Sequence, residues 1–101
     1  MTNAYRAGTG FKILHTTPRS QAASMTLEPG KSTSEKPNTH SESDQVLIVL
    51  EGTLIAEISG KRAEMSKGDA VTVPAGTPHK FTNAGSDRAV TFSVYSPPAY
   101  R

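Results

Sequence analysis

Hydrophobic and β-branched residues fall in short runs along the chain, and no stretch repeats them at the 3.6-residue spacing of an amphipathic helix. Glycines separate these runs at intervals of eight or nine residues, at Gly52, Gly60, Gly68, Gly76 and Gly85. Regular turns between short β segments are typical of an antiparallel sandwich or barrel. The pattern therefore predicts an all-β fold.

The runs also give the positions of the expected strands. Residues 46–50 are apolar at every position, which is typical of a central strand covered on both faces. Residues 90–94 alternate apolar and polar, which predicts two unlike faces. Residues 53–58 lead into Ser-Gly-Lys, an order that indicates a tight hairpin. Further strands are expected at residues 11–15, 22–27, 70–73, 80–83 and 89–95.

The chain is long enough for one domain, so residues 1–101 are expected to form a single unit with its barrel core at about residues 11–95. The ends, about residues 1–8 and 97–101, are expected to be flexible arms. A polar stretch between residues 30 and 44, rich in Ser, Thr and Lys, interrupts the strands. Loops of this length in a small domain usually carry function.

Composition narrows the class of protein. Only 35% of the residues are hydrophobic, so the core is modest and a dimer interface or a bound ion would add support. The chain has no cysteine, which excludes disulfides and thiolate metal sites and fits a reducing cytoplasm. No signal peptide begins the sequence, and the longest aliphatic run is far too short to cross a membrane.

Charge and motif searches exclude several other functions. Eleven basic and nine acidic residues are spread along the chain, and Lys61-Arg62 is the only adjacent basic pair. A solvated surface explains this better than a nucleic-acid interface, which needs a denser basic stripe. The sequence also lacks a P-loop, a dinucleotide fingerprint and a G-x-S-x-G elbow. We therefore expect a small-molecule partner, without nucleic acid and without a membrane.

Two segments carry the candidate chemistry, and the second is the more regular. Its residues fit the pattern G-x5-P-x-G-x2-H-x3-N completely, with Gly68, Pro74, Gly76, His79 and Asn83 at the five defined positions. This pattern resembles the second sequence motif of the cupins. The resemblance extends over roughly residues 20–95.

The first segment resembles the first cupin motif, G-x5-H-x-H-x3,4-E-x6-G, only in part. Counting back from Gly52, the glutamate position holds Gln45. The second histidine of the motif is His40, and Asn38 stands where the first would be. The segment therefore keeps one histidine and has an amide at two other positions.

The resemblance implies a double-stranded β-helix, a jelly-roll barrel of six to eight antiparallel strands, and a homodimer. It also implies a divalent metal ion (Zn, Ni, Fe or Mn) at the barrel mouth, with Asn38, His40, Gln45 and His79 as candidate ligands. Asn38 and His40 are two residues apart, so they share a face if that stretch is extended.

The two amides change the expected chemistry of this site. Without the carboxylate the ligand set carries no negative charge, so the metal should bind more weakly than in a complete cupin site. A carboxylate from Glu35, Glu42 or Asp44 could replace the missing one. Alternatively, the histidines and amides form a pocket that hydrogen-bonds a ligand without any metal.

Two functional hypotheses follow from these residues. One is a metal-dependent enzyme, of the dioxygenase, isomerase or decarboxylase type, acting on a small anionic or oxygen-rich molecule. The other is a non-catalytic barrel that binds or senses a small molecule. Fold alone does not decide between them.

Several residues near the motifs have expected structural roles. His15 lies outside both motifs and is expected to be structural, and Asn83 is expected to hold a turn. Phe81 and Phe92 are expected to fill the core. Tyr95 could pack there as well, or present its hydroxyl to the pocket.

Overall fold

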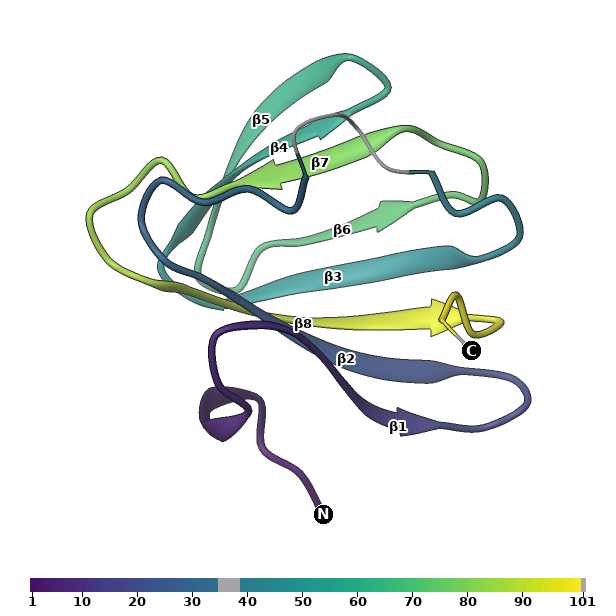
Figure 1. Cartoon of the computed structure of the whole chain (residues 1–101). Helices are drawn as coiled ribbons and strands as arrows, with labels where there is room; N and C mark the ends of the chain where they lie inside the picture. The colour runs from purple at the N-terminus through teal and green to yellow at the C-terminus, as the bar shows by residue number, and fades with distance from the viewer. Residues whose placement is uncertain (35–38, 101) are drawn as a thin grey trace.

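The computed structural model describes residues 1–34 and 39–100 of the chain, and these form eight strands and one short 3-10 helix (Figure 1). The elements in chain order are η1 (Ala4–Arg6), β1 (Gly10–Thr16), β2 (Gln21–Leu27), β3 (Asp44–Glu51), β4 (Thr53–Ile58), β5 (Lys61–Ser66), β6 (Ala70–Val73), β7 (His79–Thr82) and β8 (Ala89–Ser96). Among the described residues, no helix is long and apolar enough to span a bilayer.

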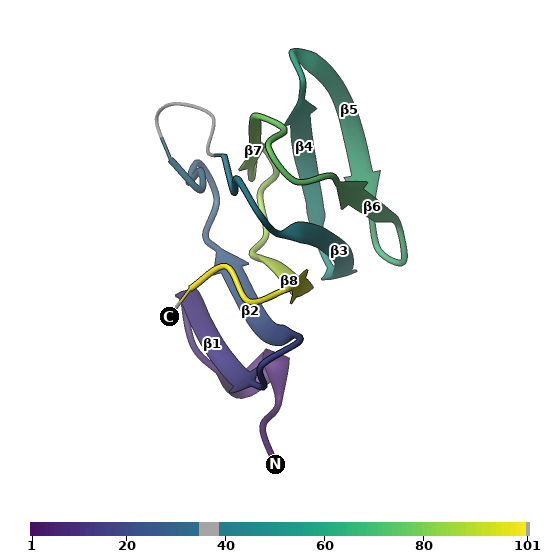
Figure 2. The same cartoon turned by 90° about the vertical axis from the view of Figure 1, so that its right-hand side faces the viewer.

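The strands form two antiparallel sheets. The larger has the order β1-β2-β8-β3-β6, and the smaller has the order β5-β4-β7. Figure 2 shows the small sheet lying across the interior from the large one. The chain passes from one sheet to the other several times, as in a double-stranded β-helix. The prediction of an all-β jelly-roll barrel is confirmed.

The seven strands whose positions were predicted agree with the hydrophobic pattern to within one or two residues, whereas no range had been predicted for β5. The tight hairpin is present between β4 and β5, where Ser59 and Gly60 both have positive φ, 51° and 77°. Two consecutive residues of this kind make a turn whose twist matches that of the flanking strands. The turn reverses the chain, so β5 pairs antiparallel with β4 and Lys61 lies opposite Ile58.

Two strands differ from the expectation, β3 in how many of its faces are covered and β8 in which face points inward. β3 is covered on its inner face only, since Leu47 and Val49 are buried whereas Val46 is 46% exposed. On β8 the apolar face points outward, because Ser93 pairs with the inward-facing Leu47. Phe92 therefore lies on the outer face of the large sheet, and the expectation that it fills the core was wrong.

Apolar side chains from both sheets fill one end of the barrel. The buried cluster consists of Leu27, Leu47, Val49, Leu54, Ala56, Met65, Val73, Phe81 and Ala89. Gly52 has a φ of 81° at the turn between β3 and β4, and an added Cβ there would lie 2.5 Å from the Arg88 carbonyl oxygen. The motif glycine is therefore required both by its conformation and by the close approach of the chain.

Asn83 has the structural role that the sequence predicted. Its side-chain amide donates to the carbonyl oxygens of Leu27 and Asp87, at 2.8 and 2.9 Å, and its Oδ1 accepts from the Gly85 N–H at 2.9 Å. It is fully buried and joins the end of β7 to the end of β2. The second motif thus contains one residue that serves the fold alone.

Both ends of the chain lie against the barrel. Near the N-terminus the Tyr5 hydroxyl donates to the Leu50 carbonyl oxygen. At the other end, residues 97–100 fold back over the end of β8, so this segment, expected to be flexible, contacts the barrel through Tyr100. His15 lies outside the interior. Its Nε2 is 3.0 Å from the Thr2 hydroxyl oxygen. The expected homodimer and cytoplasmic location stay predictions.

Candidate functional site

One end of the barrel interior is lined by polar side chains, because three neighbouring strands of the large sheet each place a polar residue there. The register aligns Gln21 of β2 with Tyr95 of β8, and Tyr95 with Gln45 of β3. All three side chains are nearly completely buried. Polar residues in this position are costly unless they are satisfied, so the row is a candidate site.

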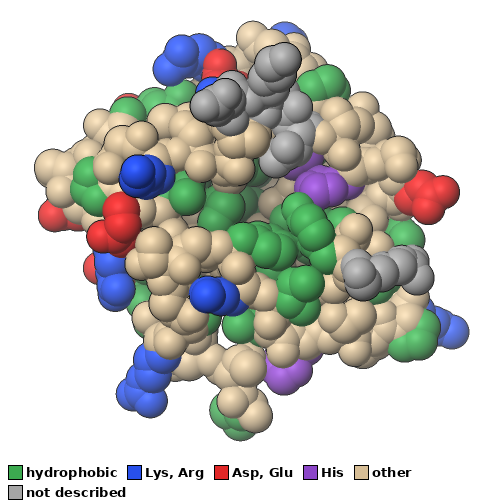
Figure 3. Space-filling view, viewed as in Figure 1, with side chains coloured by type: hydrophobic (Ala, Val, Ile, Leu, Met, Phe, Trp, Pro, Cys, Tyr) green, Lys and Arg blue, Asp and Glu red, His purple; other side chains and the backbone are tan. Residues whose placement is uncertain are grey.

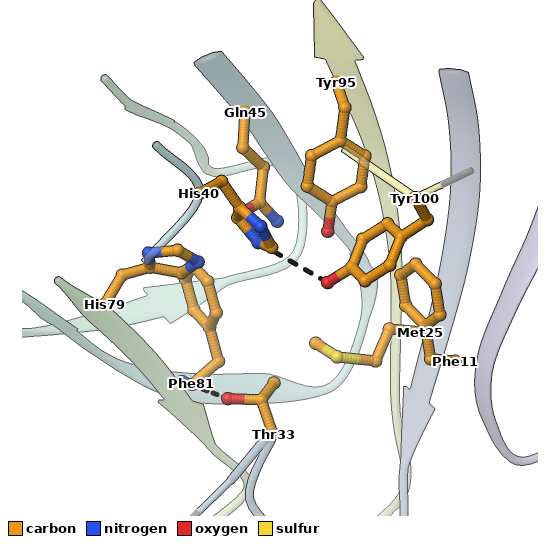
Figure 4. A pocket seen from close by; sticks show the side chains of 9 residues that line it. All are labelled: Phe11, Met25, Thr33, His40, Gln45, His79, Phe81, Tyr95 and Tyr100. Carbon is orange, nitrogen blue, oxygen red and sulfur yellow. Dashed lines mark hydrogen bonds between the residues drawn. The ribbon is translucent and has the colours of Figure 1, made fainter. Parts of the chain in front are cut away.

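A cavity of about 240 Å³ opens in front of this row. Figure 3 shows a histidine side chain beside a group of hydrophobic side chains at a hollow in the surface, and Figure 4 shows the lining residues as sticks. The lining residues are Phe11, Met25, Thr33, His40, Gln45, His79, Phe81, Tyr95 and Tyr100. None of these described lining residues is Lys, Arg, Asp or Glu, so this part of the wall carries no permanent charge.

His79 is the first residue of β7 and is 4% exposed. Its Nδ1 lies 2.9 Å from the Thr77 carbonyl oxygen. Because a carbonyl can only accept, Nδ1 carries the ring proton and Nε2 keeps a free lone pair. This contact also fixes the orientation of the ring, as hydrogen bonds to the second nitrogen do for metal-binding histidines.

His40 comes from the long loop and is held against the turn that precedes His79. The Gly76 N–H donates to the His40 carbonyl oxygen at 2.7 Å, and the Ala75 N–H donates to Asp44 Oδ1 at 2.8 Å. Gly76 has a φ of 79° here. The two motifs are therefore joined by backbone contacts, which place the His40 and His79 ring centroids 5.0 Å apart.

Burial keeps the His40 ring neutral. Loss of water, and next the neighbouring His79 ring, lower the pKa of His40 from its ordinary value of 6.5. A neutral imidazole has one nitrogen that accepts a hydrogen bond or binds a metal. The Nε2 of His40 lies 3.4 Å from the Tyr100 hydroxyl, and which of the two groups donates depends on the His40 tautomer.

Gln45 adds an oxygen to the two imidazoles. Its Nε2 donates to the Ser93 hydroxyl at 3.1 Å, which orients the amide. Its Oε1 is buried and has no hydrogen-bond partner among the residues that the structure describes. A buried acceptor without a partner costs about 1–3 kcal/mol, so it marks a place where a ligand would restore the missing contact.

Sequence reasoning missed Tyr100 and left Tyr95 undecided. The Tyr95 hydroxyl does face the pocket (Figure 4). Burial, and then the charge and hydrogen bond of Tyr100, raise the pKa of Tyr95, so this phenol stays protonated. Tyr100 follows two prolines at the end of the chain, and an aromatic residue after such a stiff segment was the one available signal.

The remaining candidate ligands fall outside this group. Asn38 and Glu35 lie outside the described residues. Glu42 is exposed, and the Asp44 carboxylate accepts from Ala75 instead of facing the cavity. Within residues 1–34 and 39–100, no group of three or more His, Asp or Glu side chains is placed to hold a metal. The expected replacement carboxylate is therefore not supplied by Asp44.

The donors present nevertheless fit a weak metal site. Two imidazoles whose nitrogens lie about 2.0–2.1 Å from one zinc ion have ring centroids roughly 4.5–5 Å apart, and the observed separation of His40 and His79 is 5.0 Å. The unpartnered Oε1 of Gln45 supplies a neutral oxygen beside them. The set lacks negative charge, so it favours a loosely bound ion over a tight structural one.

Comparison with known proteins agrees with this architecture. Residues 23–95 match the family described as "Cupin domain". An uncharacterized protein of Streptomyces coelicolor is 33% identical over 72 residues, which cover 71% of this chain and 65% of that protein. The tetracenomycin polyketide synthase protein TcmJ of Streptomyces glaucescens is 32% identical over 75 residues, which cover 74% of this chain and 49% of that protein.

A solved structure extends the likeness to almost the whole chain. The crystal structure of a Bacillus halodurans protein has a TM-score of 0.90 and 25% identity, and the match covers 97% of this chain and 77% of that one. The chain spans about half to two thirds of the length of the two curated relatives. Since the family match covers most of the chain and the barrel agrees with it, the chain belongs to the cupin domain family.

Proposed function

We propose that this protein binds a divalent metal ion with His40, His79 and Gln45, and holds an oxygen-bearing small molecule next to it. One observation carries the proposal: two oriented imidazoles lie 5.0 Å apart beside a buried amide oxygen that has no partner. Asn38 would be a fourth ligand. The metals that suit imidazole and amide donors are Zn, Ni, Fe and Mn.

The protein's own residues prepare the site for such an ion. Thr77 fixes the tautomer of His79, and Ser93 fixes the amide of Gln45. Burial favours the neutral, metal-binding form of His40. When bound, the ion would supply a Lewis acid that polarises an oxygen of the small molecule. The aromatic wall would exclude water from that oxygen, which strengthens every polar contact within the cavity.

Catalysis on a small molecule is the finer part of this proposal. The relative from Streptomyces glaucescens is a polyketide synthase protein, which supports a role in small-molecule metabolism. Reaction types open to such a site include dioxygenation, isomerisation and decarboxylation. His40, His79 and the protonated Tyr95 are the groups able to accept or donate a proton there.

A metal-free binding barrel is the second candidate. The Tyr100 hydroxyl already occupies the Nε2 of His40, and no carboxylate lines the described part of the cavity. In this alternative the imidazoles and the Gln45 amide hydrogen-bond a ligand directly. The two candidates differ in one measurable property, the metal content of the protein.

Metal analysis and titration test the proposal. Tag-free protein purified without chelator should contain Zn, Ni, Fe or Mn, and the chelated protein should bind Zn²⁺ by calorimetry. His79→Ala should abolish that binding while the barrel stays folded, as judged by circular dichroism. His15→Ala is the matched control, because His15 lies on β1 outside the cavity. Undiminished metal binding by His79→Ala would remove the assignment, and a protein that stays empty would favour the metal-free barrel.

A further inference from the structure

The side chain of Tyr100 sits in the cavity as a ligand would. Its ring lies 4.7 Å from the Phe11 ring, and its centroid is 5.4 Å from that of Tyr95 and 5.4 Å from that of His40. The Tyr95 and His40 contacts are edge to face, at 83° and 71°. Aromatic rings prefer these geometries, so the cavity is shaped around a single aromatic ring.

The polar end of Tyr100 is matched as well. Its hydroxyl oxygen lies 3.4 Å from the Nε2 of His40, which is longer than a good O–H···N contact (Figure 4). The Tyr100 hydroxyl is thus placed beside a ring nitrogen of His40. Because the tail places this hydroxyl only loosely, a free molecule of the same chemistry could approach His40 more closely.

A single residue fastens the tail that carries Tyr100. The Gln21 side chain accepts from the Tyr100 N–H at 3.0 Å and donates to the Tyr100 carbonyl oxygen. Its second amide hydrogen donates to the Thr16 hydroxyl at 3.0 Å, so the buried amide is fully satisfied. The two hydrogen bonds between Gln21 and the Tyr100 backbone act together with the ring contacts of Tyr100 to hold the tail. A free ring that makes the same aromatic contacts replaces those of Tyr100, so the backbone attachment to Gln21 is what it has to overcome.

We propose that the small molecule bound in this cavity is a single-ring phenol, and that it takes the place of the Tyr100 side chain. The inference rests on the proposed function, since it names the ligand class of the same pocket. An apolar cavity of about 150 Å³ accommodates benzene, and this one measures about 240 Å³ with Tyr100 among its walls. The volume therefore admits one substituted ring, and departure of Tyr100 would give that ring the aromatic contacts and the His40 nitrogen that Tyr100 now has.

The charges of the wall favour a phenol over a sugar phosphate or a carboxylic acid. None of the described lining residues is Lys or Arg, so the described part of the wall offers no counter-ion to a buried anionic group. A neutral hydroxyl needs only an acceptor and a donor. His40 and Tyr95 both line the cavity and present a ring nitrogen and a hydroxyl that can serve as these two partners (Figure 4). This narrows the earlier expectation of an anionic or oxygen-rich molecule.

The test uses p-cresol, which has the ring and hydroxyl of a tyrosine side chain. Calorimetry in the presence of chelator measures its binding to the full chain, to Tyr100→Ala and to Gln21→Met. Tyr100→Ala should bind p-cresol at least tenfold more tightly, since no side chain competes. Gln21→Met keeps the Tyr100 ring but removes its attachment, so it should bind at least threefold more tightly.

The second variant separates displacement from the mere creation of a hole. If Gln21→Met binds p-cresol no more tightly than the unaltered protein, Tyr100 is a fixed wall and the proposal is overturned. Unchanged affinity in a folded Tyr100→Ala would overturn it as well. Toluene is the chemical control, and equal affinity for toluene and p-cresol would overturn the assignment of a phenol. Should Tyr100→Ala fail to fold, Gln21→Met decides by the same criterion.

The outcome is independent of the metal proposal. Binding of p-cresol is measured without metal, whereas the metal site is tested by Zn²⁺ titration without p-cresol. A protein that binds p-cresol as expected but no Zn²⁺ would refute the metal site alone. The reverse result would refute the phenol alone.

Discussion

The two ends of the barrel interior are built from the same strands and have opposite characters. Along β3 the inward-facing residue changes from Gln45 at the mouth to Leu47 and Val49 deeper inside. Along β7 it changes from His79 to Phe81 within two residues. The closed end is filled by aliphatic side chains and Phe81, whereas the open end encloses a cavity.

This difference shows that, in a small barrel, one end of the interior stabilises the fold while the other end carries the polar groups of the candidate site. Apolar burial at the closed end drives folding, at about 25 cal/mol per Å². The open end contains polar groups that oppose folding, above all the unpartnered Oε1 of Gln45. Because the strands run through both ends, the filled core positions the polar row without help from the row itself.

The largest expected effect compares two phenylalanines that line the cavity, Phe81, which also belongs to the buried core, and Phe11 at the outer wall. Phe81→Ala should lower the free energy of unfolding by about 3–5 kcal/mol, because Phe81 is 1% exposed within the filled core. Phe11→Ala removes the same side chain from the cavity wall, where it is 37% exposed, and should cost less than half as much. Urea unfolding followed by circular dichroism measures both. Equal losses would mean that the open end also supports the fold.

Restoring the carboxylate of the first motif tests whether the open end binds metal at the expense of stability. Gln45→Glu should strengthen Zn²⁺ binding at least tenfold, because a charged oxygen replaces a neutral one beside His40 and His79. Without metal the same variant should be less stable, since the carboxylate is buried in a wall without counter-charge. Calorimetry and thermal unfolding with and without Zn²⁺ check the two effects. Unchanged affinity would show that Gln45 does not face the ion.

Removing polar groups from the mouth should make it resemble the core. The double variant Gln45→Leu, Ser93→Ala deletes both partners of one hydrogen bond and the unpartnered oxygen. We expect a gain of about 1 kcal/mol in the free energy of unfolding. Ser93→Ala alone is the control and should destabilise, because it leaves the Gln45 amide without any partner. A loss in the double variant would contradict the view that the polar row costs stability.

The smallest expected effect is a dependence on pH. The pKa of His40 is lowered by burial and by His79, so the unfolded chain takes up a proton more readily than the folded one. Stability from this residue is present above the unfolded pKa of about 6.5 and is lost as the pH falls through the folded value. Urea unfolding at several pH values should show this decline. The His40→Gln variant should show a shallower decline, and identical profiles would contradict the assignment.

The sequence predicted the strands well because their signals are local. β4 and β6 have the predicted bounds, and the hairpin at Ser59 and Gly60 forms as expected. Which face of a strand points inward was harder to predict, as Phe92 shows. Its own alternation favoured an apolar inner face, but pairing of β8 with β3 and β2 turns that face outward. Register is set by neighbouring strands, and these are distant in sequence.

The residues of the candidate site also fall into two groups, those that local motifs predicted and those that depend on contacts between distant segments. His40, His79 and Gln45 could be named from motif spacing, and the structure brings these three together. The roles of Thr77 and Ser93 depend on contacts that motifs do not encode. Tyr100 lay in a segment expected to be flexible, and Gln21 had no motif at all. Their pairing spans 79 positions of the chain.

The sequence by itself determined the all-β class, the strand positions and the two histidines, because turn glycines, alternation and motif spacing act over a few residues. Only the tertiary structure decided that Gln21, Tyr95 and Gln45 form one polar row, that Tyr95 and Gln45 line the cavity, and that Tyr100 joins its wall. These features depend on strand register and on contacts between distant segments. Closing the barrel creates them, so no local pattern could have specified them.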